Sequence, residues 1–469
     1  MSIDLSLDRI KRLYRLIPAY TCPTIHIAGT NGKGSVSALT SSILTSSGLI
    51  VGRFNSPHLV SIYDCIYVDG QEVSPPIYHS ARDEVEKIAK ENAIEISSFE
   101  ILVLTALLIF ERAKVDVVVL EVGMGGRMDA TNIIPDEVVL VSALTAVDLD
   151  HQAFLGDTVA AIAKEKASIA RKGKPFILGP QSHPEVAEVV RNIVAKAGGD
   201  LFFASPALAR PQPSLSLQKF QPPPPHPIEL AMPCFPVHVN ALLPLHGAHQ
   251  LDNVGLAASI ISVVTSHPTC SALGLQERVT PEVVSRGIAQ VSWPGRLSFH
   301  SIPSNPQNPD SPKLEVLADG AHNPASSATL SRYLTEYCNS LAGLNANITI
   351  TFILSLSHSP PKTPLETLSP LLPPSFSPDL QVQIRVAVLR FSPPEGMPWV
   401  KSVPPSILGS VVQTLCPEAK VWRGNDDKTD DLPEALLWAA SSADPHHLVV
   451  LAGSLYLVAD FYRIFRQNI

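Results

Sequence analysis

The stretch Ile25-His-Ile-Ala-Gly-Thr-Asn-Gly-Lys-Gly-Ser35 decides the fold of this chain of 469 residues. The short run 24–27, rich in β-branched residues, predicts a buried strand, the glycines after it predict a loop, and residues 36–44 predict a helix. Such a loop binds phosphate through backbone N–H groups, with Lys33 as a point charge and Ser35 as a Mg²⁺ ligand. Gly34 separates Lys33 from Ser35, so the strict G-x-x-x-x-G-K-[ST] pattern is not met. An ordinary strand-to-helix turn is the alternative.

The composition limits the class of protein. A chain of 469 residues is long enough for two or three domains. The net charge is −8 and no Lys/Arg stripe is visible, so we expect no nucleic-acid partner. The six cysteines are scattered without a C-x-x-C pair, which indicates reduced thiols rather than disulfides or a zinc site.

The chain offers little that would place it in a membrane. Its longest apolar run, 448–459, is too short to span a bilayer. Residues 1–10 contain no apolar signal core, and Asp4 and Asp8 argue against a transit peptide. We therefore expect a cytoplasmic protein without a membrane partner, and we leave a mitochondrial pool open.

Apolar strands alternate with helical patterns, which predicts a doubly wound α/β sheet. The runs 115–122 and 138–144 are typical of parallel strands covered on both faces. The pattern predicts a first domain over 1–293, a hinge at 294–296 and a second α/β domain over 297–469. Strands of the second domain are expected near 314–318, 348–354, 383–389 and 447–452.

Proline, present 43 times, is concentrated in a few segments. Prolines recur between about 209 and 238, and we interpret this stretch as an exposed insertion without regular structure. Proline-rich loops are expected at the surface over 302–312 and 359–378.

Polar residues follow several of the expected strands. In open parallel sheets, ligands bind beyond the carboxyl ends of the strands. Ser35, Ser56, Glu121 and His151 would meet at that edge, where oxygen ligands suit Mg²⁺. An imidazole is an unusual Mg²⁺ ligand, so His151 could instead position a water. Taken singly, Glu121 could cap a helix and His151 could be an ordinary loop histidine.

Lys166 lies on a helical pattern with Ile162 and Ile169 on the same face, whereas Lys164 points elsewhere. A buried lysine is costly unless it is paired or modified. The alternative is a lysine that snorkels to the surface. In the second half, an apolar strand ends at Asp319, which could hold a ribose or base or serve only as a turn residue.

Several motifs, in order along nearly the whole chain, resemble the folate branch of the Mur ligase superfamily, the dihydrofolate synthases and folylpolyglutamate synthases. They are His26–Ser35, Ser56-Pro-His-Leu59, Leu120-Glu-Val-Gly-Met-Gly-Gly-Arg-Met-Asp-Ala-Thr-Asn132, Asp150-His151, Glu165-Lys-Ala167, Pro294-Gly-Arg296, Asp319-Gly-Ala-His-Asn323 and Leu451-Ala-Gly-Ser-Leu455. The resemblance implies a Mur-ligase-like fold, with an N-terminal P-loop domain and a smaller C-terminal Rossmann-like α/β domain.

The resemblance also implies roles for single residues. The ATP-binding set would be Gly29, Thr30, Asn31, Gly32, Lys33, Gly34, Ser35, Asn253, Arg296 and Asp319. The Mg²⁺ ligands would be Ser56, Glu121, His151 and Lys166, the last matching a lysine that is carbamylated in the family. Catalysis would rest on Lys33, Lys166 and His151. The pterin substrate would contact Ser97, Ser98, Phe99, Glu100, Met128, Asp129 and Ala130.

Two activities of the family compete. A dihydrofolate synthase joins L-glutamate to dihydropteroate through an acyl phosphate, using ATP and Mg²⁺; a folylpolyglutamate synthase extends the glutamate tail of a folate. Segments 394–400 and 1–10 resemble the fungal dihydrofolate synthases, which favours the first activity. We expect the enzyme to be a monomer. The alternative from another class is a P-loop ATPase or switch protein without ligase activity. Two departures are Ser168, where glycine is usual, and the loop 355–360, which lacks the charged residues common in relatives.

Overall fold

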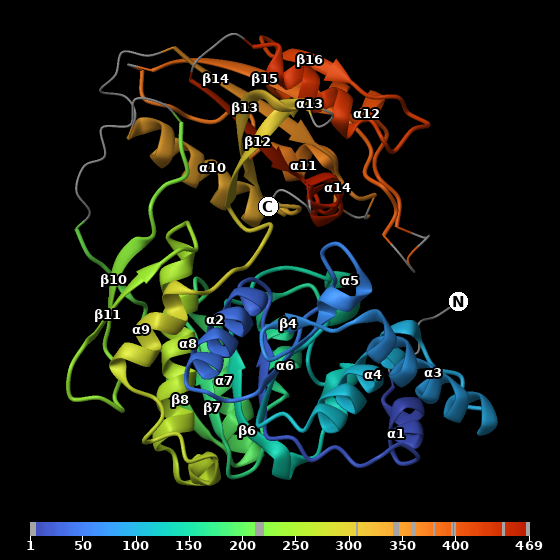
Figure 1. Ribbon diagram of the computed structural model, residues 1–469, viewed down its shortest axis with the longest axis vertical. Coiled ribbons are helices and arrows are strands. Elements are labelled where there is room, and N and C mark those ends of the chain that lie inside the picture. The colour runs from blue at the N-terminus through green and yellow to red at the C-terminus, as the bar shows by residue number, and fades with distance from the viewer. Residues whose placement is uncertain are drawn as a thin grey trace.

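The computed structural model describes residues 6–211, 220–305, 308–340, 347–358, 360, 362–378, 380–394, 397, 400–442 and 446–465. It consists of two α/β units that lie one above the other, the first blue to yellow and the second yellow to red (Figure 1). The first is built on an eight-stranded sheet and the second on a six-stranded sheet. The α/β fold class predicted from the sequence is therefore confirmed.

The eight-stranded sheet has the order β4-β3-β2-β5-β1-β6-β7-β8. From β2 to β8 its strands are parallel, while β3 and β4 add an antiparallel edge. Every residue of β1 and β5 is buried, because helices cover both faces of the sheet. The strands are β1 (Thr24–Ala28), β2 (Val51–Phe54), β3 (Ile66–Val68), β4 (Gln71–Glu72), β5 (Val117–Glu121), β6 (Val139–Leu144), β7 (Pro175–Leu178) and β8 (Asp200–Phe203).

The helices of the first unit form three hydrophobic clusters with the sheet. One cluster joins α2, α8 and α9 to one face, and the others join α1, α3, α4, α6 and α7 to the opposite face. The α-helices are α1 (Asp8–Tyr14), α2 (Lys33–Ser46), α3 (Pro75–Glu91), α4 (Ser98–Ala113), α5 (Gln152–Leu155), α6 (Val159–Ala167), α7 (Glu185–Ala197), α8 (His249–Ser266) and α9 (Pro281–Ala289). The 3₁₀ helices are η1 (Ile62–Cys65), η2 (Ala130–Ile133), η3 (Asp136–Val138) and η4 (Pro268–Leu273).

The proline-rich stretch forms part of a third, small sheet. Strands β9 (Leu208–Ala209), β10 (His226–Leu230) and β11 (Val239–Leu243) pair antiparallel in the order β11-β10-β9. Ile228 and Leu230 are buried in the core beside α8 and α9. The expectation of an exposed, irregular insertion is therefore wrong for 226–230, where alternating apolar residues outweigh Pro227. Residues 212–219 lie outside the described part of the chain.

The six-stranded sheet has the order β12-β13-β17-β14-β15-β16, with only β12 antiparallel to its neighbour. Its strands are β12 (Ser298–Asn305), β13 (Asn308–Ala318), β14 (Asn347–Leu354), β15 (Gln381–Val388), β16 (Lys420–Arg423) and β17 (His447–Ala452). Its helices are α10 (Pro324–Asn339), α11 (Pro364–Leu368), α12 (Pro405–Leu415), α13 (Leu432–Ala440) and α14 (Leu455–Phe465). The predicted loop 302–312 is instead part of the β12–β13 hairpin, and α11 interrupts the predicted loop 359–378.

Two segments connect the units. The first is the predicted hinge, in which Gly295 adopts a φ of +75° and donates a hydrogen bond from its N–H to Tyr462 Oη at 3.2 Å. The second is residues 220–226, which we call the strap and which lies beside α10 (Figure 1). Phe220 is buried in the core of the second unit, and Tyr337 Oη donates to the Gln221 carbonyl at 2.7 Å.

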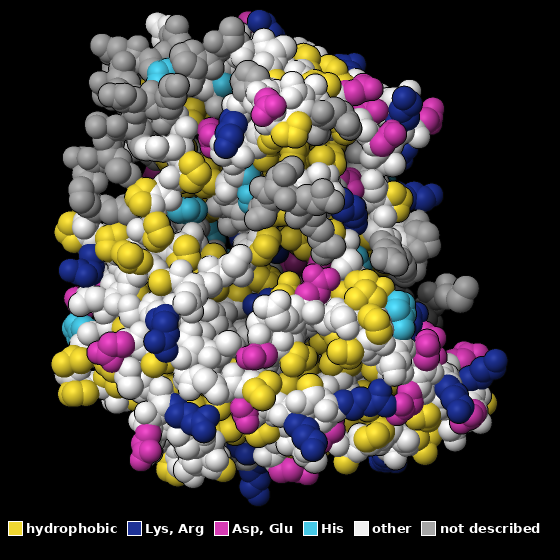
Figure 2. Space-filling model, viewed as in Figure 1, with side chains coloured by type: hydrophobic (Ala, Val, Ile, Leu, Met, Phe, Trp, Pro, Cys, Tyr) yellow, Lys and Arg dark blue, Asp and Glu magenta, His cyan; other side chains and the backbone are white. Residues whose placement is uncertain are grey.

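Acidic and basic side chains are interspersed over the face of the molecule seen in Figure 2. All six cysteines are free thiols, as predicted. Within the described residues, no helix combines the length and the apolar character needed to cross a membrane.

Candidate active site

The glycine-rich loop between β1 and α2 is held in a shape that only glycine permits at two positions. Gly32 has a φ of +93°, and a Cβ there would lie 2.3 Å from Asn253 Oδ1. A Cβ on Gly29 would lie 1.8 Å from Thr145 Oγ1. The N–H groups of Thr30 and Asn31 donate to the Ala146 carbonyl at 2.9 and 3.2 Å. The loop therefore leads directly into the N-terminus of α2, where phosphate is bound in other proteins.

Lys33 and Ser35 occupy the first turn of α2. Lys33 Nζ donates to the Thr30 carbonyl at 3.3 Å and lies 3.9 Å from Glu121 Oε1. Ser35 Oγ accepts from Gln250 Nε2 at 3.4 Å, and Asn253 Nδ2 donates to Gln250 Oε1 at 2.9 Å. Helix α8 thus brings the predicted Asn253 to the loop, together with Gln250, which sequence reasoning missed. Its place three residues before Asn253 on the same helix face was the available signal.

Glu121, the last residue of β5, supplies a buried carboxylate beside the loop. Its Oε2 accepts from Asn55 Nδ2 at 2.6 Å. Burial raises the pKa of Glu121, although Lys33 and Asn55 oppose this. Asn55 Oδ1 is also buried and has no hydrogen-bond partner. Two such oxygens, one charged and one unpaired, are donors that fit a hard cation such as Mg²⁺.

Two further sequence-predicted ligands, Ser56 and His151, follow β2 and β6, which are separated in the sheet by β5 and β1. Ser56 follows β2, adjacent to Asn55. His151 is the N-cap residue that precedes α5, with a left-handed φ of +50°, and its Nε2 lies 3.7 Å from Asp150 Oδ2. Burial lowers the pKa of His151, Asp150 opposes this, and Lys166 lowers it further, which leaves a neutral imidazole. Among the described residues no group of three or more His, Cys, Asp and Glu could hold a metal, so hydroxyl and phosphate oxygens would have to complete the shell.

Lys166 turns inward, as the helical spacing predicted. It is 3% exposed, and its Nζ donates to the Gly29 carbonyl at 2.9 Å. Ile162 and Ile169 are buried beside it, whereas Lys164 is exposed. Burial, together with the nearby Lys33, lowers the pKa of Lys166 to about 7. A neutral amine is thus accessible at neutral pH, which is what carbamylation by CO₂ requires.

The residues suggested for the pterin lie beyond β5. Phe99 covers Gly123, where a Cβ would lie 2.3 Å from Phe99 Cζ. Asp129 is buried and accepts from Met124 N at 2.8 Å and from Thr131 Oγ1 at 2.6 Å. The remaining members start or flank the adjacent helices, namely Ser97 and Ser98 at α4, and Met128 and Ala130 at η2.

Glu100, in contrast, is engaged within its own helix cap. Its carboxylate accepts from Ser97 N at 2.8 Å and from Ser97 Oγ at 2.7 Å. Arg9 contacts the same carboxylate at 3.3 Å. These contacts give Ser97 and Glu100 a capping role at the start of α4.

Arg296 and Asp319 bring the second unit to the site. Asp319 Oδ2 accepts from Leu297 N at 2.9 Å and Oδ1 from Ala321 N at 2.8 Å. Burial lowers the pKa of Arg296, while the carboxylates of Asp319 and Glu121 raise it. The Arg296 guanidinium therefore interacts electrostatically with one carboxylate from each unit.

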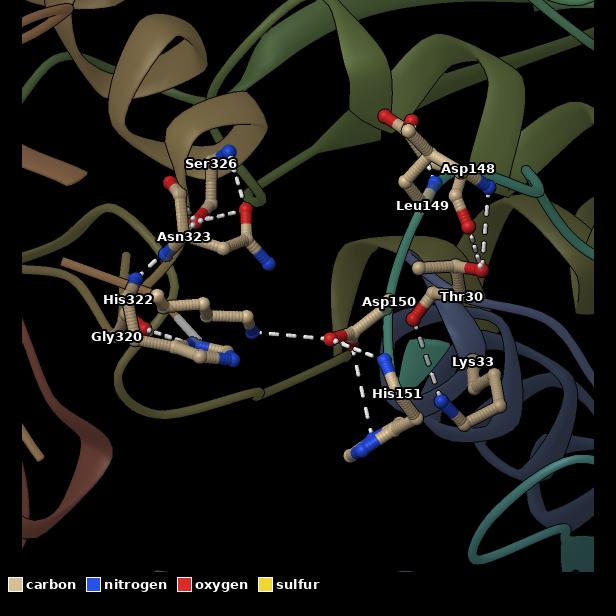
Figure 3. A network of polar contacts seen from close by, with 11 residues as sticks. Thr30, Lys33, Asp148, Leu149, Asp150, His151, Gly320, His322, Asn323 and Ser326 are labelled. Atoms are coloured by element: carbon tan, nitrogen blue, oxygen red, sulfur yellow. Dashed lines mark hydrogen bonds and ion pairs between the residues drawn. The ribbon is translucent and has the colours of Figure 1, made fainter. Parts of the chain in front are cut away.

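A further contact between the units was not predicted. Lys362 Nζ, beyond β14, donates to Asp150 Oδ1 at 3.0 Å, and the same oxygen accepts from His151 N. Although burial opposes ionisation, His151 and Lys362 hold the pKa of Asp150 at about 2. Figure 3 shows Asp150 and His151 on one side and His322 on the other, with their side chains turned into one space. Lys362 is the first described lysine after the atypical loop 355–360, and that position was the only signal.

Comparison with known proteins gives consistent matches. The family described as "Dihydrofolate synthetase, C-terminal domain" matches residues 303–464. The dihydrofolate synthetase of Saccharomyces cerevisiae is 30% identical over 474 residues, 100% of both chains. The dihydrofolate synthase/folylpolyglutamate synthase of Mycobacterium tuberculosis is 35% identical over 71% of this chain and 67% of its own. The structure of E. coli FolC in complex with DHPP and ADP is similar with a TM-score of 0.73 and 26% identity, covering 100% of this chain and 95% of that one.

Proposed function

The chain belongs to the family of dihydrofolate synthases and folylpolyglutamate synthases, and we propose that it joins L-glutamate to 7,8-dihydropteroate to give dihydrofolate, ADP and phosphate. It is an ATP-dependent ligase of folate synthesis. The observation that carries the proposal is that Lys166 contacts the Gly29 carbonyl and Glu121 lies near Lys33, so that both side chains lie at the glycine loop. In addition, a dihydrofolate synthetase matches the chain over its full length.

A carboxylate does not react with an amine at neutral pH because oxide is a poor leaving group. Transfer of the γ-phosphoryl group of ATP to the pteroate carboxylate gives an acyl phosphate, from which phosphate can leave. Backbone N–H groups of the loop 29–35 would hold the ATP phosphates, and Lys33 would neutralise charge on the transferring group. The attraction between two opposite unit charges about 4 Å apart is about 4 kcal/mol at an effective dielectric constant of about 20.

Ser35, Ser56, Glu121 and His151 would hold Mg²⁺, whose charge would offset that of the phosphates. A carbamylated Lys166 would replace a cation by an anion at the Gly29 carbonyl and so add a ligand instead of a repelling charge. Asn253 of the first unit would contact the nucleotide, together with Arg296 of the connecting segment and Asp319 of the second unit. Closure of the units about 294–296 would keep water from the acyl phosphate.

Extension of a folate by a further glutamate is the second candidate. The Mycobacterium tuberculosis relative carries both activities in its name, which is the observation that favours it. No observation favours an ATPase or switch protein without ligase activity, because that role leaves the second unit unexplained, including the carboxylate of Asp319 that acts on Arg296.

The purified protein with ATP and Mg²⁺ tests this assignment. We expect ADP release and a dihydropteroate–glutamate product only when both dihydropteroate and L-glutamate are present, and much slower product formation with tetrahydrofolate. Lys33→Ala should abolish the product while circular dichroism stays unchanged, since Lys33 is partly exposed and outside the core. Faster turnover of tetrahydrofolate than of dihydropteroate would assign the chain to the second activity.

A further inference from the structure

Trp293 precedes the hinge and packs against the first unit. Its side chain lies partly buried against the hydrophobic cluster that contains α2, α8 and α9. Two residues later in the sequence, the chain is held by the second unit: Gly295 N donates to Tyr462 Oη of α14, and a Cβ on Gly295 would lie 3.0 Å from Val458 Cγ1 of the same helix. The short step from Trp293 to Gly295 therefore carries the chain from one unit to the other.

The indole of Trp293 covers the glycine loop at Gly34. A Cβ on Gly34 would lie 2.3 Å from Trp293 Cζ2 and 2.9 Å from Cε2. Gly34 is part of the first turn of α2, so its backbone conformation is one that any residue can adopt. The indole is therefore what excludes a larger residue from the position between Lys33 and Ser35, where the strict phosphate-loop pattern has no glycine.

An arginine fixes the orientation of the indole from the side of the sheet. Arg53 Cζ, on β2, lies 5.3 Å from the centroid of the Trp293 ring and 4.1 Å from that of the Tyr67 ring on β3. The attraction of a guanidinium to an aromatic face is about 0.5–1 kcal/mol at exposed sites and increases where water is excluded. The edge of the indole thus rests on α2 while its ring is held by Arg53.

The covered glycine lies between the two residues of the loop that would handle the phosphate. In the proposed reaction, Lys33 neutralises charge on the transferring phosphoryl group and Ser35 helps to hold Mg²⁺. Such groups must be placed closely, because a displacement of about 1 Å can lower a rate by about 100-fold. A movement of the second unit about the hinge reaches Trp293 through Pro294, and the indole transmits it to Gly34.

We propose that Trp293 is a positioning residue: as the second unit closes, the indole presses on Gly34 and brings Lys33 and Ser35 into their working positions. The inference rests on the proposed function, because it requires that the loop bind ATP. Phosphoryl transfer would then be timed to the closed state, in which water is kept from the acyl phosphate. Trp293 acts through the loop and needs no contact of its own with a substrate.

A double-mutant cycle between Gly34 and Trp293 tests the contact, with formation of the dihydropteroate–glutamate product as the readout. We expect Gly34→Ala to lower kcat by about 100-fold, because the added methyl group meets the indole and displaces the first turn of α2. Trp293→Phe should lower kcat by about 10-fold, because a phenyl ring is too short to press on Gly34. In the double variant the phenyl ring leaves room for the methyl group, so kcat should recover to about one tenth of the wild-type value instead of falling by about 1000-fold.

Two further measurements separate positioning from a general loss of structure. The Kd for ADP, measured by calorimetry, should stay within about threefold of wild type in Trp293→Phe, because ADP lacks the phosphoryl group that is transferred. In protein labelled with 5-fluorotryptophan, the fluorine NMR signal of Trp293 is identified by its absence in Trp293→Phe. This signal should shift when an unreactive ATP analogue and dihydropteroate are added together.

Trp438 provides the matched control. It is also partly buried and also stacks with an arginine, Arg385 Cζ lying 4.0 Å from its ring centroid. It belongs, however, to α13, in the part of the second unit that lies away from the first (Figure 1). We expect Trp438→Phe to keep kcat within about twofold of wild type, and the fluorine signal of Trp438 to stay in place.

Several results would overturn the inference. Losses that multiply in the double variant would show that Gly34 and Trp293 act independently, and an unchanged kcat in either single variant or a Trp293 signal that does not shift would also contradict the role. A fall in kcat with an equal loss of ADP binding in Trp293→Phe would reduce Trp293 to a structural residue. Absence of product with the wild-type protein would instead overturn the proposed function, and this inference with it.

Discussion

The side chain of Lys166 is 3% exposed, and its amine donates to the Gly29 carbonyl. The positive charge of the nearby Lys33 lowers the pKa of this amine further than burial alone. Two ammonium groups so close to the proposed metal and phosphate site would repel Mg²⁺, whereas a carbamate would bind it. The sequence predicted the inward face from the spacing of Ile162 and Ile169. It could not predict the Gly29 contact, because a hydrogen bond between residues that far apart depends on the packing of α6 against the loop.

Lys166→Ala should lose activity by about 10²-fold or more, because a ligand beside the phosphates is removed. Short carboxylic acids added to this variant should restore part of the rate by occupying the vacated space. Lys164→Ala, which alters an exposed lysine on the same helix, should remain close to wild type. Steady-state rates with and without acetate are the measurement. An active Lys166→Ala enzyme would refute carbamylation.

The carbamate also implies a dependence on pH and CO₂. Only the neutral amine reacts with CO₂, and the pKa of Lys166 is lowered to about 7. The neutral fraction grows as the pH rises through that value, so activation by added bicarbonate should be weak below it and strong above it. Preincubation at several pH values, followed by assay at one common pH, measures this. Activation that is the same at every pH would contradict the assignment.

Glu121→Gln keeps the side-chain volume and removes the charge. The Mg²⁺ concentration that gives the half-maximal rate should rise by at least about 10-fold in this variant. The reason is that the buried anion that offsets the charge of Mg²⁺ is lost. The Mg²⁺ titration of the rate is the measurement. A curve that overlays that of the wild type would show that Glu121 is not a ligand.

Among the elements, the loop between β1 and α2 depends most strictly on residue type. Gly32→Ala would place a methyl group against Asn253 Oδ1 at a φ of +93°. We expect ADP binding, measured by calorimetry, to weaken about 10-fold or more. Gly48→Ala is the control, since Gly48 also has a positive φ but nothing within 4 Å of its added Cβ. Equal loss in both variants would mean that strain in general, and not the shape of the loop, weakens binding.

The sequence pattern predicts some helices and strands and misses others. The central strands β1, β5 and β6 were predicted because helices bury both of their faces and the sequence is continuously apolar. The antiparallel strands β10 and β12 were missed because each contains a proline, Pro227 and Pro303, within a short half-buried run. Proline is tolerated there at positions where no ladder N–H is required.

At the scale of the whole molecule, the strap joins the two units beside the hinge. Phe220 belongs in sequence to the first unit but is 5% exposed in the core of the second, 5.8 Å from the Tyr337 ring centroid. Tyr337 in turn packs with Phe299 and Tyr333. This placement could not be read from the sequence, because a single phenylalanine among prolines has no periodicity.

Phe220→Ala should therefore destabilise the unit to which Phe220 does not belong in sequence. We expect the urea transition of the second unit to lose about 3–5 kcal/mol of unfolding free energy, the usual cost of emptying a buried phenylalanine site. Phe203→Ala is the control, because Phe203 is 54% exposed on β8. An unchanged transition in Phe220→Ala would show that the strap does not anchor the second unit.

The central claim is that the reaction passes through an acyl phosphate, and the fate of one carboxylate oxygen atom tests it most directly. The protein is incubated with ATP, Mg²⁺, L-glutamate and dihydropteroate labelled with oxygen-18 in its carboxylate, and the released phosphate is analysed by mass spectrometry. The account predicts one labelled oxygen in each phosphate released and an amide carbonyl that keeps the other. Phosphate that carries no label, with ADP still released, would show that ATP is hydrolysed by water and would contradict the account.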